Sequence, residues 1–228
     1  MALVAGLDGC RGGWLMITLE TASRQVDMSL ASAWAELDLA RFARIAVDMP
    51  IGLADGGPRA CDLAARALLP RGRKSSVFAP PRRYMLACGS WQQAQAEGRR
   101  RDGVGLSKQS WNLCTKIAEI DRQIRPKDQD RLLEAHPELI FHNLNDWRPL
   151  APKKTPEGTR QRRDILARNG IALPPDEAAP PRRLAAPDDL LDAAACALAA
   201  ERVLAGRACR LPADPERDSR GLRTEIWY

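Results

Sequence analysis

Two short apolar runs that each end in an aspartate constrain the fold of this 228-residue chain more than any other feature. Leu3–Leu7 is followed by Asp8, and Ile45–Val47 is followed by Asp48. Runs of this length and composition are typical of buried strands. Whether both aspartates reach the same edge of one sheet depends on the chain between them.

The chain between the two runs predicts an antiparallel meander followed by a crossover. The glycine pair at 12–13 favours a tight hairpin into a second strand at Trp14–Leu19, and Gln25–Leu30 alternates like a third strand. Trp34–Ala43 has the apolar spacing of a helix. A crossover of this kind makes the fourth strand parallel to the first. Both aspartates then lie at the carboxyl ends of parallel neighbours, where open α/β sheets bind ligands.

The rest of the chain predicts helices and one more strand. The expected elements are helices at Arg59–Leu69, Ser107–Ile124 and Arg160–Asn169, a strand at Leu133–Pro137 with a polar face, a proline-rich connector at Ala172–Pro187, and a last helix with Asp188 as N-cap and Gly206 just after its end. The last helix is rich in alanine, so it can pack very close to a sheet. The length predicts a single domain, 1–228, with a basic, largely helical insert at about 58–126.

Basic residues are concentrated in one part of the chain. Between Arg59 and Arg101, ten lysines and arginines are opposed by two acids, a net charge of +8, whereas the whole chain carries +6. A solvated basic surface and a phosphate-facing patch explain this concentration equally well.

The composition also excludes several classes of protein. The six cysteines include no C-x-x-C pair, which argues against a zinc site or a disulfide framework. No apolar stretch approaches the roughly 20 residues that span a membrane, and the N-terminus has no basic leader. By elimination we expect a cytoplasmic protein with no membrane partner.

Acidic residues stand where the predicted fold would gather them. They are Asp8, Asp48, Glu134, Asp189 and Asp192. Each alone is explained by a turn, a solvated strand or a helix dipole. Two carboxylates about 4 Å apart repel by about 4 kcal/mol at an effective dielectric of 20, so a cluster must protonate, spread apart or hold cations. Carboxylate ligands favour Mg²⁺ or Mn²⁺, and two such ions can activate water and stabilise the leaving oxygen of a phosphodiester.

A set of sequence motifs running from one end of the chain to the other carries a resemblance to a known family. The motifs include "GLDGCRGGW", "VDMPIGL", "RACDLAAR", "SVFAPPRR", "EAHPELIF", "DDLLDAAACALAA" and "GLRTEIWY". With them the chain resembles the family catalogued as domain of unknown function 429, whose members are predicted ribonuclease H-like nucleases. The resemblance implies an α/β fold with a ribonuclease H-like mixed five-stranded sheet, in which strands 1–3 form an antiparallel meander and strands 4 and 5 run parallel to strand 1. It also implies catalytic metal ligands at Asp8, Asp48, Glu134 and Asp192, with Asp189 as a further metal ligand.

Other residues are candidates for contacts with a nucleic acid or a nucleotide-like phosphate substrate. Arg59, Arg82 and Lys154 could touch a phosphate, Gln109 and Lys116 could reach a cleft from one face of their helix, and His136 could orient water or a leaving group. A solvated helix face explains Gln109 and Lys116 equally well, and for His136 a bond to a neighbouring residue is slightly favoured. The oligomeric state is left open.

Two other functions remain open at this stage. One is a non-catalytic nucleic-acid-binding protein of the same fold. The other, less favoured, is an actin-like-fold phosphotransferase, which would share the acid on strand one and the glycine hairpin. That class normally needs a second copy of the fold, and the chain contains no repeated motif.

Overall fold

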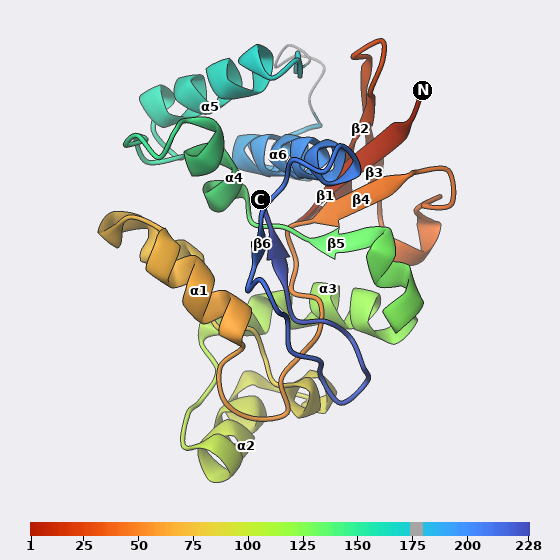
Figure 1. Ribbon diagram of the computed structural model, residues 1–228. Helices are drawn as coiled ribbons and strands as arrows, with labels where there is room; N and C mark the ends of the chain where they lie inside the picture. The colour runs from red at the N-terminus through yellow and green to blue at the C-terminus, as the bar shows by residue number, and fades with distance from the viewer. Residues whose placement is uncertain (174–179) are drawn as a thin grey trace. The chain divides into compact units, whose positions relative to one another are not determined.

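The computed structural model describes residues 1–173 and 180–228, which form two compact units (Figure 1). The first unit comprises residues 1–49, 130–209 and 227–228, and the second comprises 50–129 and 210–226. The predicted basic insert at about 58–126 falls in the second unit. The assignment of the whole chain to a single domain stays a prediction.

A five-stranded mixed sheet is the centre of the first unit (Figure 1). Its strands are β1 (Leu3–Cys10), β2 (Gly13–Glu20), β3 (Val26–Ala31), β4 (Arg44–Val47) and β5 (Leu132–Glu134). They lie in the order β3-β2-β1-β4-β5. The first three strands pair antiparallel, β4 runs parallel to β1, and β5 runs parallel to β4. This confirms the predicted layout of the sheet.

The hairpin between β1 and β2 depends on one glycine. Cys10 pairs with Gly13, so only two residues lie in the turn. Gly13 has a φ of 128°, and a Cβ at this position would lie 1.9 Å from the carbonyl oxygen of Ala31 on β3. No residue with a side chain fits there, so the glycine allows three strands to approach at this corner.

The predicted helix at Trp34–Ala43 is wrong. Only one 3₁₀ turn forms, at Trp34–Glu36, and Leu37 returns to extended backbone. Ala33, which precedes the turn, has no side-chain oxygen to accept the free N–H groups at the start of a helix. Trp34 and Phe42 are both buried, so the apolar spacing reflects two anchors of an irregular connection rather than one helix face.

The predicted strand at Leu133–Pro137 is correct only in its first half. β5 ends at Glu134, and Pro137 opens helix α4 (Pro137–Leu144). Proline is favoured at the first helical position because its missing N–H has no partner there. The alternation that suggested a polar strand face is therefore broken, and Glu134 is buried rather than solvated.

Three helices of the first unit pack together. They are α4, α5 (Pro156–Arg168) and α6 (Pro187–Leu204), with α6 against β1, β2 and β4, and the other two against α6 (Figure 1). The N-cap of α6 is Ala186 and not Asp188 as predicted, because Pro187 takes the first helical position. Gly206, with a φ of 66°, follows the helix as predicted. Residues 174–179 of the predicted connector at Ala172–Pro187 lie outside the described residues.

Helix α6 contacts β1 through backbone atoms. A Cβ built on Gly6 would lie 2.0 Å from the Ala197 nitrogen and 2.1 Å from the Ala193 carbonyl oxygen. Every residue from Leu190 to Ala200 is buried, and most of them are alanine. The small side chains on both sides let the helix lie directly on the strand, as its composition predicted.

The second unit is mainly helical. It contains α1 (Ala60–Leu68), α2 (Trp91–Asp102), α3 (Lys108–Gln123), and 3₁₀ turns at Arg71–Ser76 and Arg83–Ala87, while β6 (Arg210–Leu211) pairs with β7 (Ile226–Trp227) where the chain returns to the first unit. The predicted helices at Arg59–Leu69 and Ser107–Ile124 match α1 and α3, but α2 was not predicted. Its sequence is strongly polar, and only Ala94 and Gly98 are buried, so it lacks the apolar stripe that reveals a helix.

Candidate metal centre

Three aspartates from three elements of the first unit meet at the carboxyl end of β1. Leu7 pairs with Val47 across β1 and β4, and the Asp48 amide donates to the Leu7 carbonyl at 3.0 Å. This register brings Asp8 and Asp48 together, and the second turn of α6 adds Asp192. One carboxylate oxygen of each aspartate lies within 4.8 Å of those of the other two.

Burial of these carboxylates makes their negative charge costly. Asp8 is 7% exposed and Asp192 is 4% exposed. Burial, together with the charge of neighbouring aspartates, raises the pKa of Asp8 and of Asp48 well above the ordinary value. Burial also raises the pKa of Asp192 to about 6, although Lys153 opposes the shift. A positive group at the centre of the three oxygens would remove this cost.

Lys153 already supplies one positive charge to the cluster. Its Nζ lies 2.6 Å from Oδ2 of Asp192 and 3.6 Å from Oδ2 of Asp188. Burial alone would lower the pKa of Lys153, but the carboxylates of Asp192 and Asp48 outweigh it and raise the pKa. Lys153 is therefore the cationic partner of the cluster, and the all-oxygen donor set of the three aspartates fits a hard divalent cation.

The two further acids predicted as metal ligands lie beside this group. Glu134 is 6% exposed and pairs with Val47, the residue before Asp48, and its charge raises the pKa of Asp48. The Asp189 carboxylate accepts the Ala186 amide at 2.7 Å and so caps α6. Among the described residues, neither belongs to the group whose oxygens lie within 4.8 Å of one another. Their assignment as ligands stays a prediction.

A buried ion pair supports the loop that carries Lys153. Arg162 on α5 is fully buried and donates to Glu138 on α4 at 2.7 Å. It also donates to the carbonyls of Ala151 and Gly158, each at 3.0 Å, on either side of that loop. Removing one partner of such a pair leaves a buried charge uncompensated, so the pair fixes the loop strongly.

Sequence reasoning selected Lys154 and missed Lys153. Lys154 is exposed, whereas Lys153 turns toward Asp192. Two adjacent lysines on a loop carry no periodic signal that says which one faces the sheet. The only usable signal was their joint position before the capped start of α5, where the Thr155 side chain accepts the Gly158 amide.

His136 lies in the first unit, where it caps α4. Its Nδ1 accepts the Leu139 amide at 3.4 Å. This is the local bond that the sequence slightly favoured over a role in orienting water. The catalytic role stays a prediction.

The other predicted substrate contacts lie in the second unit. Arg59 is 2% exposed and donates to both carboxylate oxygens of Asp62 and to two backbone carbonyls. Arg82 lies 3.3 Å from the carboxylate of Asp102, and Lys116 forms an ion pair one turn along its own helix. Each of these cations thus has an acidic partner, and their contact with phosphate stays a prediction.

Comparison with known proteins identifies one family. A family profile described as "Protein of unknown function (DUF429)" matches residues 6–217. No curated protein and no solved structure matches. Within residues 1–173 and 180–228, no helix has both the length and the apolar character needed to cross a membrane.

Proposed function

We propose that this chain, which belongs to the DUF429 family, is a divalent-metal-dependent nuclease that hydrolyses phosphodiester bonds by a two-metal carboxylate mechanism. The observation that carries the proposal is the convergence of Asp8, Asp48 and Asp192 from β1, β4 and α6. Folding brings three like charges together, two of them buried, at a cost in stability, and binding of cations is the function that accounts for this cost.

The donor chemistry selects the metal. All three groups are carboxylates, and hard oxygen ligands suit Mg²⁺ or Mn²⁺ better than zinc. Asp8, Asp48 and Asp192 would hold the metal, and we propose Glu134 and Asp189 as further ligands for a second ion. Bound there, a pair of such ions would activate water and stabilise the leaving oxygen of a phosphodiester.

The chain's own residues have three tasks in this reaction. The aspartates must be ionised, so their raised pKa values predict a loss of activity at acid pH. Lys153 holds the Asp192 carboxylate in place and partly neutralises it. The burial of Asp8 and Asp192 excludes bulk water from their side of the site, which strengthens every charge interaction there.

The substrate we propose is a nucleic acid or a nucleotide-like phosphate. The basic excess of the chain lies in the segment between Arg59 and Arg101, which belongs to the second unit. Arg59, Arg82, Lys116 and Lys154 are the cations we propose for phosphate contact, and Arg59 would have to exchange some of its bonds to Asp62 and to backbone carbonyls for bonds to the phosphate. His136, at the start of α4, is the residue we propose for orienting water.

A nuclease screen tests the proposal. Single-stranded, duplex, hybrid and branched substrates are incubated with Mg²⁺ or Mn²⁺, using the parent chain, Asp48→Asn, and the exposed control Asp164→Asn. We expect metal-dependent cleavage by the parent and the control, and none by Asp48→Asn. Binding of nucleic acid without cleavage by any form would instead support the non-catalytic alternative, and cleavage by Asp48→Asn equal to that of the parent would refute the proposed centre.

A further inference from the structure

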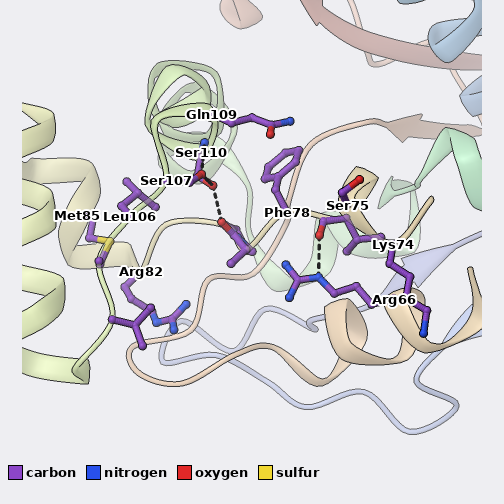
Figure 2. Close-up of a pocket in the computed structure, with 15 residues that line it drawn as sticks. Arg66, Lys74, Ser75, Phe78, Arg82, Met85, Leu106, Ser107, Gln109 and Ser110 are labelled. Atoms are coloured by element: carbon purple, nitrogen blue, oxygen red, sulfur yellow. Dashed lines mark hydrogen bonds between the residues drawn. The ribbon is translucent and has the colours of Figure 1, made fainter. Parts of the chain in front are cut away.

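The second unit contains a cavity that the proposed metal centre does not use. It has a volume of about 520 Å³, within the range of small-molecule binding sites (Figure 2). Its walls come from the end of α1, from residues 74–82, which begin in the 3₁₀ turn Arg71–Ser76, and from residues 104–110 at the start of α3. Among the described residues that line it, three are cationic, Arg66, Lys74 and Arg82, and none is acidic. A cavity with this lining selects an anionic ligand.

The cations of the cavity differ in how far they are already neutralised. Arg82 is paired with Asp102 at 3.3 Å. The Arg66 Nε donates to the Val77 carbonyl at 2.7 Å, which fixes the guanidinium against the wall, as Figure 2 shows. Within the described part of the chain, no acidic side chain pairs with Arg66 or Lys74. The guanidinium edge that remains matches the oxygens of a phosphate.

An aromatic ring and an amide complete the lining. Phe78 lies between the two basic residues and the start of α3 (Figure 2). Gln109 is exposed at the first turn of α3 and offers both a donor and an acceptor. Ser110 is committed to the Ala79 carbonyl at 2.7 Å, so it shapes the wall rather than reading a ligand. A flat heterocycle stacked on the Phe78 ring could form hydrogen bonds with the Gln109 amide.

We propose that this cavity holds one unpaired nucleotide, with its phosphate at Arg66 and Lys74 and its base against Phe78. The inference rests on the proposed function, because it names the substrate of the nuclease as single-stranded or locally unpaired nucleic acid. Lys74 and Gln109 are exposed at the cavity, so a continuing strand can leave it into solvent. A base that is stacked within a duplex cannot reach such a ring.

Binding without cleavage tests this inference separately from the chemistry. Fluorescence anisotropy is measured with EDTA present, using a labelled oligothymidylate, the same strand with abasic sites, and a duplex, and free thymidine 5′-monophosphate is added as competitor. The variants are Phe78→Leu, Phe78→Tyr, Arg66→Gln, and the control Arg71→Gln, an exposed arginine outside the cavity lining.

The base contact and the phosphate contact predict different losses. Phe78→Leu should weaken binding of the normal strand roughly tenfold and leave the abasic strand unchanged, while Phe78→Tyr binds like the parent. Arg66→Gln should weaken binding of both strands and lower the slope of log K against log salt concentration by about 1. The loss of affinity should be larger for Arg66→Gln than for the control Arg71→Gln. Equal affinities of Phe78→Leu, Arg66→Gln and Arg71→Gln for every strand would overturn the inference.

The outcomes separate this site from the metal centre. Suppose that thymidine monophosphate binds the parent and binds Phe78→Leu and Arg66→Gln more weakly, whereas the strand binds all three equally. The occupant of the cavity would then be a free nucleotide, and the assignment to a strand would be overturned. Cleavage that persists without any dependence on Phe78 or Arg66 overturns the cavity inference alone. Cavity binding with no cleavage under any metal overturns the proposed nuclease and leaves the nucleotide site standing.

Discussion

Replacing Asp8 by asparagine should stabilise the metal-free protein. The three carboxylate oxygens lie within 4.8 Å of one another, so each ionised pair repels by at least about 3.5 kcal/mol at an effective dielectric of 20. The substitution removes both pairs that involve residue 8. Because protonation already relieves part of this repulsion in the parent, we expect a net gain of about 2–3 kcal/mol at pH 8, or roughly 5–10 °C in Tm.

The gain should depend on pH in a defined direction. The folded state raises the pKa values of Asp8, Asp48 and Asp192, so it retains protons that the unfolded chain has lost. The contribution of these three aspartates to the free energy of unfolding of the parent is therefore most favourable below about pH 4. It loses that stability as the pH rises through the raised values, which include about 6 for Asp192. The advantage of Asp8→Asn should shrink toward pH 5 and grow toward pH 8.

Thermal unfolding with and without Mn²⁺ provides the assay. Saturating Mn²⁺, at about 100 times its Kd, should stabilise the parent by about 2.7 kcal/mol and stabilise Asp8→Asn far less. The exposed Asp164→Asn on α5 should match the parent in both conditions. A Tm of Asp8→Asn at or below that of the parent in metal-free buffer at pH 8 would refute the reasoning, as would an equal response to Mn²⁺.

Three further predictions concern the lysine, the strand–helix contact and the basic segment. Lys153→Gln removes the cation that competes for Asp192, so titration calorimetry should show Mn²⁺ binding about tenfold tighter, with no change for Lys154→Gln; weaker binding would contradict this. Gly6→Ala forces a Cβ to 2.0 Å from the backbone of α6 and should cost more than about 3 kcal/mol in chemical denaturation; a loss under 1 kcal/mol would contradict the close contact. Neutralising the arginines at 99–101 should weaken polyanion binding and flatten its salt dependence by up to three in slope, and an unchanged slope would mark them as ordinary surface.

The sheet and the three-aspartate cluster were predictable because both follow from local pattern and topology. Apolar runs that end in Asp8 and Asp48, joined by a meander and a crossover, leave few arrangements of the strands. The alanine-rich helix that carries Asp192 could approach the sheet only along its small face. These constraints act over short stretches of sequence and leave few sterically allowed arrangements, so the sequence pattern was sufficient to predict the sheet and the cluster.

The surroundings of the cluster were not predictable in the same way. The pairing of Arg162 with Glu138 and the turn of Lys153 toward Asp192 join residues far apart in the chain, and no spacing rule links them. The failed helix at Trp34–Ala43 has the same origin, because burial of Trp34 and Phe42 by the whole unit overrode a local periodicity. Tertiary contact decides such cases, and one sequence does not reveal it.

The direct contact between α6 and β1 makes the geometry of the three-aspartate cluster independent of most other core residues. Main-chain atoms of the helix meet the main chain of the strand where Gly6 lacks a side chain, so the spacing between Asp8 and Asp192 is set without any bulky residue. Apolar residues elsewhere in the core can therefore change in size without changing that spacing. Position 6 and the alanines opposite it, in contrast, must stay small.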